Sequence, residues 1–359
     1  MPPVKILVAD DSTFLRRLVV RLLEATGDFT VIDTAADGAE AVKKICGLKP
    51  EAVSLDLEMP VQDGLSVLRQ IMRRCPTPVV MLSSHTTKGA RATMQALSLG
   101  AVDFVAKPEK PGLLDVMVAE LALKLKTAAL VSAHRLMFSS PVPEAVPAGN
   151  KGLPDERAKS VRPAPERGRV ELIVVGSSTG GPAALQKLIP ALPAHFPAAV
   201  VVVQHLPPGF SASLAEHLNR HSRLKVRHAE AGEPVAPGQV LVAPAGCELV
   251  FRGRAGGVSV GLESCGEARA PGAFRPSVDG VMLSAAGLYG ARSMGVLLTG
   301  MGKDGAKGMA AIRERGGPTI AEDESTCVIF GMPKAAIETG AAQKVLPLGE
   351  IAGEIVKMV

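Results

Sequence analysis

Short apolar runs alternate five times with longer amphipathic stretches between residue 1 and about residue 125. The first pair is VKILVAD followed by FLRRLVVRLLEATG, and the last is DFVAKP followed by LLDVMVAELALKL. Runs of the first kind predict buried strands, and stretches of the second kind predict helices that cover them. This alternation therefore predicts a doubly wound parallel sheet, in which ligands bind at the carboxyl ends of the strands.

Polar residues stand where these predicted strands end. Asp10 and Asp11 follow the first strand, Asp56 ends the third, Ser83 ends the fourth and Lys107 ends the fifth. Carboxylates that are close together repel each other, so a cluster of three indicates a hard divalent cation and a nearby ammonium group. Mg²⁺ is the natural occupant. The Asp-Asp-Ser sequence alone also fits a helix N-cap, but its coincidence with the other three residues favours a cation site.

A change of composition separates this region from the rest of the chain. The segment from Ser139 to Gly168 is polar, lacks periodicity and is rich in proline, which predicts an extended linker. We expect the preceding stretch, about Lys126 to Phe138, to prolong the last helix. A chain of 359 residues is long for a single core. The sequence thus predicts two domains, 1–125 and 169–359, joined by a linker over 126–168.

The second region again combines apolar runs with helix-forming segments. LIVVG, AAVVVVQHL and MGVLLTG are each followed by a predicted helix, the first of which opens at Pro182. Between the second and third of these units, KVRHAE, VLVAP, ELVFRG and GVSVGLE predict a β-rich insertion. We expect a second α/β domain with a mostly parallel sheet, an antiparallel insertion and a site at the carboxyl ends of its strands.

The sequence LIVVGSSTGG contains the G-x-S-x-G spacing at Gly176, Ser178 and Gly180. This spacing presents a serine hydroxyl at the top of a sheet and at the start of a helix. The same turn also fits a helix cap or a phosphate cradle, whereas a dinucleotide site would require G-x-G-x-x-G. His205 and Asp304 follow two other predicted strands. Together the three side chains supply a nucleophile, a base and a carboxylate that orients the base.

Composition excludes several classes of function. The formal net charge is +5 without a basic stripe, and the chain has one tyrosine and no tryptophan, so we expect no nucleic-acid binding. No run of about 18 apolar residues and no signal peptide is evident, so we expect a cytoplasmic protein that does not insert into membranes. The five cysteines lack C-x-x-C spacing and are interpreted as core thiols. His217 and His221 lack the H-E-x-x-H context of a zinc site.

The segments VADDS, LDLEMPVQDG, MLSS and DFVAKP together resemble the receiver domain of two-component response regulators. The resemblance implies a flavodoxin-like (βα)₅ fold in which Asp56 accepts a phosphoryl group from a histidine kinase. It also implies that Ser83 and Lys107 contact the phosphoryl oxygens and that Phe104 is the aromatic switch residue. The implied ligands of Mg²⁺ are Asp10, Asp11, Asp56 and the backbone carbonyl of Glu58.

The segments LIVVGSSTGGPAALQKL, VVVQHLPPGF, PSVDGVMLSAA, LLTGMGKDGAKGM and CVIFGMPKAAI resemble the catalytic domain of the chemotaxis protein-glutamate methylesterases, the CheB family. The resemblance implies that Ser178 is the nucleophile, His205 the general base and then acid, and Asp304 the orienting carboxylate. It further implies that the Met301 backbone N–H donates to the oxyanion and that Thr179 helps to position His205.

The two resemblances imply a phosphorylation-activated hydrolase of chemotaxis adaptation. It would demethylate glutamyl methyl esters on methyl-accepting chemoreceptors, release methanol and deamidate glutamines, with no cofactor in the catalytic domain. The unphosphorylated receiver would cover the catalytic cleft. Ser177 stands where the family usually has alanine, so the reactive serine is open, although the spacing favours Ser178. The alternatives are a regulator whose second domain binds a partner or nucleic acid, and a nucleotide-binding oxidoreductase.

Overall fold

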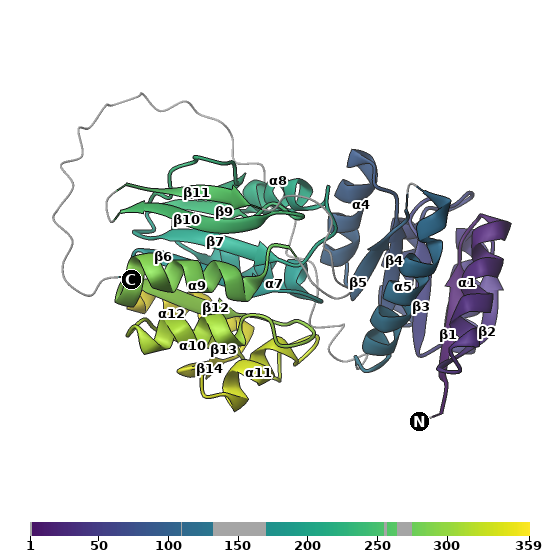
Figure 1. Cartoon of the computed structure of the whole chain (residues 1–359). Coiled ribbons are helices and arrows are strands. Elements are labelled where there is room, and N and C mark those ends of the chain that lie inside the picture. Colours follow the sequence, from purple (N-terminus) through teal and green to yellow (C-terminus); the bar gives the residue numbers. More distant parts are fainter. Residues whose placement is uncertain (1, 109, 132–169, 255–256, 264–274) are drawn as a thin grey trace.

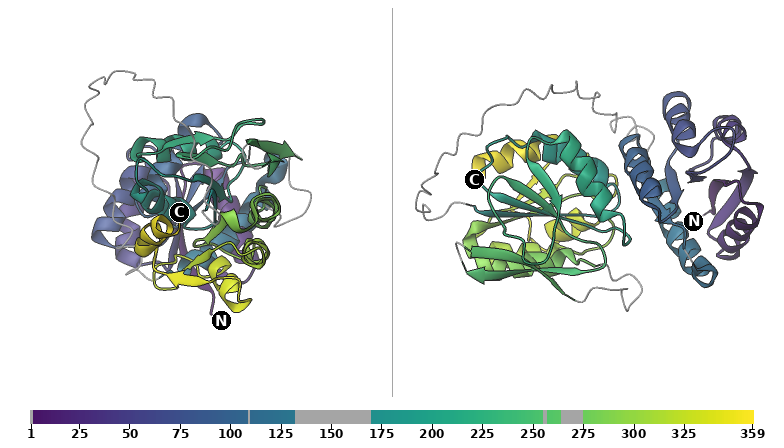
Figure 2. Two further views of the ribbon diagram at one scale, coloured as in Figure 1. Left: turned by 90° about the vertical axis from the view of Figure 1, so that its left-hand side faces the viewer. Right: turned by 90° about the horizontal axis from the view of Figure 1, so that it is seen from above.

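The chain folds into two α/β domains that lie side by side (Figure 1). The structure is a computed structural model and describes residues 2–108, 110–131, 170–254, 257–263 and 275–359. The proline-rich segment predicted as a linker lies outside these residues. The view from above separates the two domains, each with its own strands and helices (Figure 2, right).

The N-terminal sheet has five parallel strands in the order β2-β1-β3-β4-β5. This is the doubly wound arrangement that the fivefold alternation predicted. The elements in chain order are β1 (Val4–Ala9), α1 (Thr13–Ala25), β2 (Phe29–Ala35), α2 (Gly38–Leu48), β3 (Ala52–Asp56), α3 (Gly64–Arg74), β4 (Val79–Ser83), α4 (Thr87–Ser98), β5 (Asp103–Ala106), a short 3₁₀ turn (Pro111–Leu113) and α5 (Leu114–Ala129).

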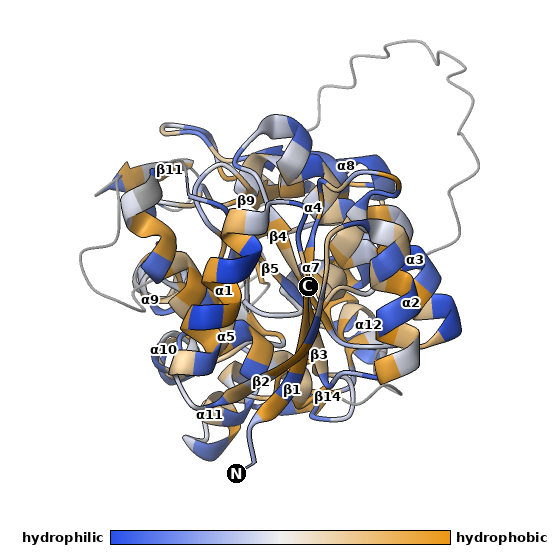
Figure 3. Cartoon of the chain, turned by 90° about the vertical axis from the view of Figure 1, so that its right-hand side faces the viewer, coloured by the Kyte–Doolittle hydropathy of each residue, from blue (hydrophilic) through white to orange (hydrophobic). Residues whose placement is uncertain are grey.

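Helices α1 to α4 each start at a side chain that caps them. Ser12, Asp37, Asp63 and Thr86 each accept a hydrogen bond from a backbone N–H of the first turn that follows. The helices alternate apolar and polar segments, while the strands between them are mainly apolar (Figure 3). The apolar faces of the helices therefore cover the sheet, and the polar faces meet water.

The C-terminal sheet has seven parallel strands in the order β14-β13-β12-β6-β7-β9-β8. Strand β6 is central. Its neighbour β7 is the next strand along the chain, whereas its other neighbour β12 comes from a distant part of the chain. The elements are β6 (Leu172–Ser177), α7 (Gly181–Leu188), β7 (Ala199–Gln204), α8 (Ser211–His221), β8 (Lys225–His228), β9 (Gln239–Val242), β10 (Glu248–Arg254), β11 (Gly257–Glu263), α9 (Val278–Tyr289), β12 (Ser293–Leu297), α10 (Ala306–Glu314), β13 (Thr319–Glu322), α11 (Met332–Glu338), β14 (Lys344–Leu346) and α12 (Leu348–Met358), with 3₁₀ turns at Ile189–Ala191 and Gly290–Arg292.

The predicted β-rich insertion divides between two sheets. Its first two strands, β8 and β9, join the parallel sheet at one edge. Its last two strands, β10 and β11, form an antiparallel pair that packs on α9. The antiparallel part of the domain is thus a separate hairpin.

Helix α5 ends the N-terminal domain. It spans Leu114–Ala129, with Leu130 as its C-cap, so the helix includes the first residues of the stretch expected to prolong it. The rest of that stretch, from residue 132, lies outside the described residues. Neither α5 nor any other helix in the described part of the chain is long and apolar enough to cross a membrane.

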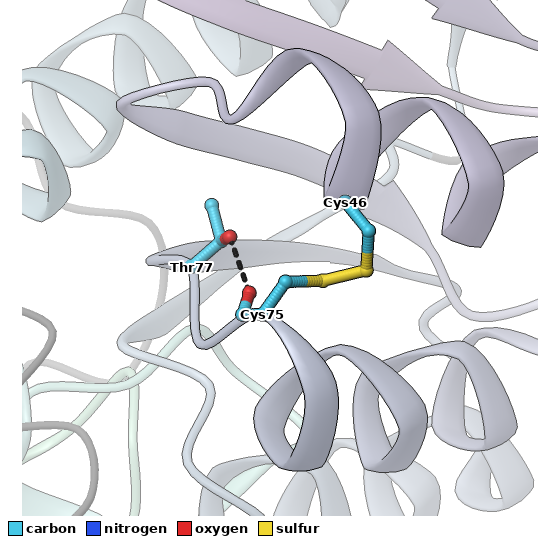
Figure 4. Close-up of a disulfide and its surroundings, with 3 residues drawn as sticks. All are labelled: Cys46, Cys75 and Thr77. Atoms are coloured by element: carbon cyan, nitrogen blue, oxygen red, sulfur yellow. Dashed lines mark hydrogen bonds between the residues drawn. A yellow bond between two sulfur atoms is a disulfide. The ribbon is translucent and has the colours of Figure 1, made fainter.

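The interpretation of the cysteines as core thiols is wrong for Cys46 and Cys75. Cys46 lies near the end of α2 and Cys75 is the C-cap of α3, and the two form a disulfide (Figure 4). Cys247 is also disulfide-bonded, whereas Cys327 is a buried free thiol. The sequence could not indicate the first pair, because its cysteines are 29 residues apart and meet only when two helices converge.

Candidate active site

Three polar side chains follow three neighbouring strands of the C-terminal sheet. Ser178 follows β6, His205 follows β7, and Asp304 lies in the loop between β12 and α10. These strands are adjacent and parallel. Because the carboxyl ends of parallel strands share one edge of a sheet, the fold brings the three residues to the same region.

The turn after β6 distinguishes two adjacent serines. Ser177 is fully buried, and its Oγ donates to Gln204 Oε1 at 2.6 Å. Ser178 is 8% exposed, and its backbone N–H donates to Thr299 O at 3.0 Å. The hydroxyl of Ser177 is thus held by a buried amide, which leaves Ser178 better placed to meet a substrate.

Gln204 ties the turn to the end of β7. Its Nε2 donates to Ser178 O at 2.9 Å and to His205 O at 3.0 Å. A side chain on Gly181 would meet Gln204 Oε1 at 2.0 Å, and Gly180 has a φ of 78°. Glycine is therefore required at both positions, once for space and once for conformation.

His205 lies against the carboxylate of Asp304. The histidine is 7% exposed, and its Nε2 is 2.9 Å from Asp304 Oδ2. With Nε2 protonated, the histidine donates to the carboxylate, and Nδ1 is the basic ring nitrogen. This pairing is the arrangement by which a carboxylate fixes the tautomer and orientation of a general base.

The carboxylate of Asp304 is fixed by the N-terminus of α9. Its Oδ1 accepts from Ser277 Oγ at 3.0 Å and from the Asp279 N–H at 2.8 Å, and its Oδ2 accepts from the Val278 N–H at 2.8 Å. Burial opposes ionisation, but the hydrogen bond from His205 and these backbone donors outweigh it and lower the pKa of Asp304 to about 2. Asp304 is therefore an anion at every physiological pH.

Asp279 holds the helix that follows Asp304. Its Oδ1 accepts from the N–H groups of Gly305 at 2.9 Å and Gly308 at 2.8 Å, at the start of α10. The start of α9 thus holds Asp304, which precedes α10, and the start of α10 holds Asp279, which lies in the first turn of α9. No role for Asp279 was predicted from the sequence, although this acid stands in the segment PSVDGVMLSAA that carries the family resemblance.

The segment after β12 lies against the turn that carries Ser178. A Cβ atom on Gly300 would be 2.8 Å from Ser178 Cβ and 3.0 Å from Ser178 N. Only glycine permits this approach of two backbones. Met301 is the next residue, so its backbone N–H belongs to the segment that approaches this turn.

Thr179 contacts the N-terminal domain. Its Oγ1 donates to Asp103 Oδ2 at 2.6 Å, and Thr179 is only 6% exposed. Asp103 is the first residue of β5 and also pairs with Lys124 Nζ at 3.3 Å. In this structure the hydroxyl expected to position His205 is bound by a carboxylate of the other domain.

An aromatic contact joins the same two domains. The rings of Phe104 and Phe210 are 4.6 Å apart between centroids, and both side chains are almost fully buried. His85 meets Phe210 edge-on at 5.7 Å. Phe210 ends the short loop that begins at His205, so this loop is covered by the N-terminal domain.

Polar contacts extend the interface along α4 and α8. Arg91 forms an exposed ion pair with Glu216 at 3.0 Å, and Ser98 Oγ lies 3.2 Å from His217 Nε2. Burial, with His221 and Arg220 nearby, lowers the pKa of His217 to about 4. The histidine is therefore neutral at the interface.

The acidic residues of the N-terminal domain gather as the sequence predicted. Asp10, Asp11 and Asp56 offer carboxylate oxygens within 4.8 Å of one another, the only such group of possible metal ligands among the described residues. Lys107 Nζ pairs with Asp56 Oδ2 at 2.6 Å and with Asp10 Oδ2 at 3.2 Å. Burial raises the pKa of Asp56 to about 6 against the opposing effect of Lys107. Crowded oxygen donors of this kind fit a hard divalent cation.

The remaining predicted residues lie at the same edge. The Glu58 N–H donates to Asp56 Oδ1 at 3.3 Å, which places that backbone beside the acidic cluster. Ser83 ends β4 and is fully buried, and its Oγ accepts from Thr93 Oγ1 at 2.7 Å. In this structure the Ser83 hydroxyl is thus held by α4.

Asp103, Gln204 and Glu322 are among the buried polar residues that support these sites and were not predicted. Gln204 and Glu322 each end an apolar strand of the C-terminal sheet. A polar residue at the carboxyl end of such a strand indicates a functional site, so both could have been identified from the sequence. The role of Asp103 depends on how the two domains pack, which no local pattern could indicate.

The comparisons with known proteins cover both domains. Residues 173–355 match the family described as CheB methylesterase, and residues 6–119 match the response regulator receiver domain. The chain is 46% identical over 361 residues to the protein-glutamate methylesterase/protein-glutamine glutaminase of Symbiobacterium thermophilum. This alignment covers 99% of this chain and 97% of that relative. Identity to the protein of the same name from Archaeoglobus fulgidus is 45% over 358 residues, covering 98% and 97%. The crystal structure of the Thermotoga maritima CheB methylesterase catalytic domain matches with a TM-score of 0.51 and 46% identity, covering 53% of this chain and 99% of that chain.

Proposed function

The chain belongs to the CheB methylesterase family, and we propose that Ser178, His205 and Asp304 carry out its reaction. It is a protein-glutamate methylesterase/protein-glutamine glutaminase of chemotaxis, with a receiver domain before the catalytic domain. We assign the receiver to residues 1–125, the linker to 126–168 and the catalytic domain to 169–359. The observation that carries the catalytic assignment is the 2.9 Å contact of His205 Nε2 with Asp304 Oδ2 beside the Ser178 turn.

Hydrolysis of a glutamyl methyl ester proceeds through a glutamyl-enzyme. Ser178 Oγ attacks the ester carbonyl while His205 accepts the serine proton at Nδ1, and Asp304 stabilises the resulting imidazolium. The C–O bond to the methoxy group then breaks, and methanol leaves with the proton from His205. Water, activated by His205, hydrolyses the acyl-enzyme and restores the Ser178 hydroxyl. Deamidation of glutamine follows the same steps, with ammonia as the leaving group.

Backbone donors stabilise the oxyanion of both tetrahedral intermediates. The Met301 N–H is the proposed donor, because the Gly300 backbone approaches Ser178 closely enough to exclude a Cβ atom. Thr179, next to the nucleophile, is proposed to help position His205 once its hydroxyl leaves Asp103. Water is the only co-reactant, so the proposal includes no cofactor in the catalytic domain.

Asp56 is the proposed phosphoryl acceptor of the receiver domain, and a histidine kinase is the phosphodonor. Mg²⁺ would be held by Asp10, Asp11, Asp56 and the backbone carbonyl of Glu58, whose carboxylates lie within reach of one ion. When bound, the ion supplies positive charge that offsets the oxygens of the transferring phosphoryl group. Lys107, already paired with Asp56, would contact those oxygens, as would Ser83 after its hydroxyl rotates away from Thr93.

The receiver domain inhibits the catalytic domain by covering it. Asp103 binds the hydroxyl beside the nucleophile, and Phe104 packs on the loop that carries His205. Both receiver residues lie on β5, which leads directly to Lys107 at the phosphorylation site. The phosphoryl group on Asp56 would attract the Lys107 ammonium group just past the end of β5. This would shift the population toward domain arrangements in which these contacts are broken.

The proposed setting is the cytoplasm, where the signalling helices of chemoreceptors and their histidine kinase are found. The substrates are methyl-accepting chemoreceptors, and the proposal includes neither nucleic-acid binding nor insertion into membranes. It draws on the family membership and on the domain composition.

Methanol release from methylated receptor tests the catalytic assignment. The Ser178→Ala variant should lose activity, and Ser177→Ala is its matched control, because it removes the neighbouring hydroxyl and leaves the bonds of Gln204 Nε2 in place. Retained methanol release by Ser178→Ala would refute the mechanism. Loss of activity in Ser177→Ala alone would assign the reaction to the other serine.

Acetyl phosphate tests the regulatory assignment. It should raise methanol release by the intact protein and leave the Asp56→Ala variant unchanged. An equal response of both proteins would contradict phosphorylation of Asp56 as the control.

A further inference from the structure

Glu322 is a fully buried carboxyl group at the carboxyl end of β13. This is the edge of the sheet where Ser178, His205 and Asp304 lie. Burial of an acid is costly unless hydrogen bonds satisfy its oxygens. The proposed chemistry does not use Glu322, so its place in the core requires another explanation.

Both oxygens of Glu322 accept hydrogen bonds from neighbouring segments. Oε2 accepts from the Thr299 N–H at 2.8 Å, and Oε1 accepts from Thr326 Oγ1 at 3.0 Å. The first of these donors belongs to the segment after β12, and the second to the loop before α11. Glu322 therefore joins two loops at the same edge.

Thr299 is the centre of the backbone around the nucleophile. Its carbonyl accepts from the Ser178 N–H at 3.0 Å, and its Oγ1 donates to Thr179 O at 3.0 Å. The Ile329 N–H in turn donates to Thr299 Oγ1 at 2.9 Å. The contact from Glu322 thus reaches the nucleophile turn through one residue.

The position of Thr299 also sets the proposed oxyanion donor. Gly300 follows it and lies against Ser178, and Met301 comes next. If the Thr299 N–H lost its acceptor, this backbone would be free to shift, and the distance between Ser178 Oγ and the Met301 N–H would change. Misplacement by about 1 Å can lower a rate about a hundredfold.

We propose that Glu322 is a positioning residue that holds Thr299, and through it sets the nucleophile turn and the Met301 N–H relative to each other. This inference rests on the proposed function of Ser178 and Met301. Glu322 acts through the reach of its acceptor oxygen and not through its charge. A carboxyl oxygen can accept from the Thr299 N–H in either protonation state, so a glutamine amide oxygen should serve equally well.

Electrostatics agree with that assignment. Burial raises the pKa of Glu322, although hydrogen bonds from the Thr299 N–H, Thr326 and Cys327 and the charge of Lys187 counteract the effect. The environment therefore favours the neutral form more than water does, as expected for a residue retained as a hydrogen-bond acceptor.

Paired substitutions separate reach from charge. Glu322→Gln keeps the length and loses the charge, whereas Glu322→Asp keeps the charge and shortens the side chain by one methylene. We expect kcat for methanol release to stay within about threefold in Glu322→Gln and to fall roughly tenfold to hundredfold in Glu322→Asp, with KM unchanged within about twofold. Glu322→Met keeps the length without an acceptor, should resemble Glu322→Asp, and provides the comparison if the aspartate variant does not fold.

Ser293→Ala is the matched control for loss of a buried hydrogen bond in the same sheet. Ser293 is fully buried at the amino end of β12, and its Oγ donates to Gly290 O at 2.7 Å, at the opposite edge from the site. Its kcat should match that of the parent. The inference is overturned if Glu322→Gln is as impaired as Glu322→Asp, if neither shortening nor removal of the acceptor lowers kcat, or if Ser293→Ala is impaired equally. Activity retained by Ser178→Ala would instead refute the proposed function.

Discussion

Asp56 and Asp304 both lie at the carboxyl edge of a parallel sheet, yet their surroundings shift their pKa values in opposite directions. Asp56 is buried beside a second carboxylate, and Lys107 is its main counter-charge, so burial raises its pKa to about 6. Asp304 is also desolvated, but it accepts from His205, Ser277 and two backbone N–H groups of α9, and its pKa falls to about 2.

The difference shows how one architectural position serves two kinds of chemistry. At Asp56 the fold leaves negative charge partly uncompensated, an environment that suits the proposed cation and phosphoryl group. At Asp304 the fold supplies the donors itself, which fixes the anion that we propose orients a base. The environment and not the residue type sets the role of each acid.

The largest expected effect tests the fixed anion. Asp304→Asn removes the charge and presents His205 with an amide that can also donate, so the base loses its orientation. We expect kcat for methanol release to fall by roughly 10³–10⁴, as for a comparable change in a serine protease triad. Steady-state kinetics with saturating acetyl phosphate measure this loss. A decrease in kcat smaller than about tenfold, in a variant with the melting temperature of the parent, would contradict the role of Asp304 as a fixed anion that orients His205.

The Cys46–Cys75 disulfide lies in the domain that contains Asp56. Cys46–Cys75 closes a loop that contains β3 and therefore Asp56. For a separation of 29 residues, loop-closure entropy predicts that the double Cys→Ser variant loses about 3–4 kcal/mol of stability. Denaturant unfolding of the parent and the variant under oxidising conditions measures the loss. A reductant should lower the stability of this domain in the parent and have no effect on it in the variant. Methanol release of the folded variant should equal that of the parent, and a lower kcat would contradict a purely structural role.

The pH dependence of stability should differ in sign between the two acids. The folded pKa of Asp56 lies above its ordinary value of 3.8, so its ionisation destabilises the fold fully above about pH 6 and ceases to do so as the pH falls toward 4. In EDTA, Asp56→Asn should therefore raise stability by about 1–3 kcal/mol at pH 8, with the gain vanishing near pH 4.

Asp304 provides the opposite case in the same measurement. Its folded pKa lies below 3.8, so its ionisation stabilises the fold above about pH 4, and this stabilisation is lost as the pH falls toward 2. Asp304→Asn should lower stability at pH 8. A gain in both variants, or a loss in both, would show that the two environments are not opposed.

Sequence patterns predicted the two α/β domains and the clustering of their site residues for a specific reason. Strand ends can be located from the lengths of apolar runs, and parallel strands place their carboxyl ends on one edge. Asp10, Asp56 and Lys107 meet for that reason. The disulfide, the Asp279 contact with α10 and the Thr179 contact with Asp103 each join segments that only tertiary packing brings together. Local periodicity has no information about such contacts.

The smallest predicted effect concerns the contact that links the two sites. Asp103→Ala removes the acceptor of Thr179 Oγ1 without altering the nucleophile, the base or the phosphorylation site. Without phosphodonor, methanol release should rise about tenfold, because a buried hydrogen bond to a charged group contributes about 1.5 kcal/mol to the covered arrangement. Activation by acetyl phosphate should shrink by the same factor, since both changes draw on one equilibrium.

Arg91→Ala is the matched control for this contact. Arg91 also crosses the domain interface, in an ion pair with Glu216, but both side chains are more than half exposed. Exposed pairs of this kind contribute little, so its basal rate should change less than about twofold. An equal rise in both variants would indicate that any weakening of the interface releases the catalytic domain. If the basal rate of methanol release does not rise in Asp103→Ala, the receiver inhibits by coverage alone. The phosphorylation site and the catalytic site would then be coupled without the hydrogen bond between Thr179 and Asp103.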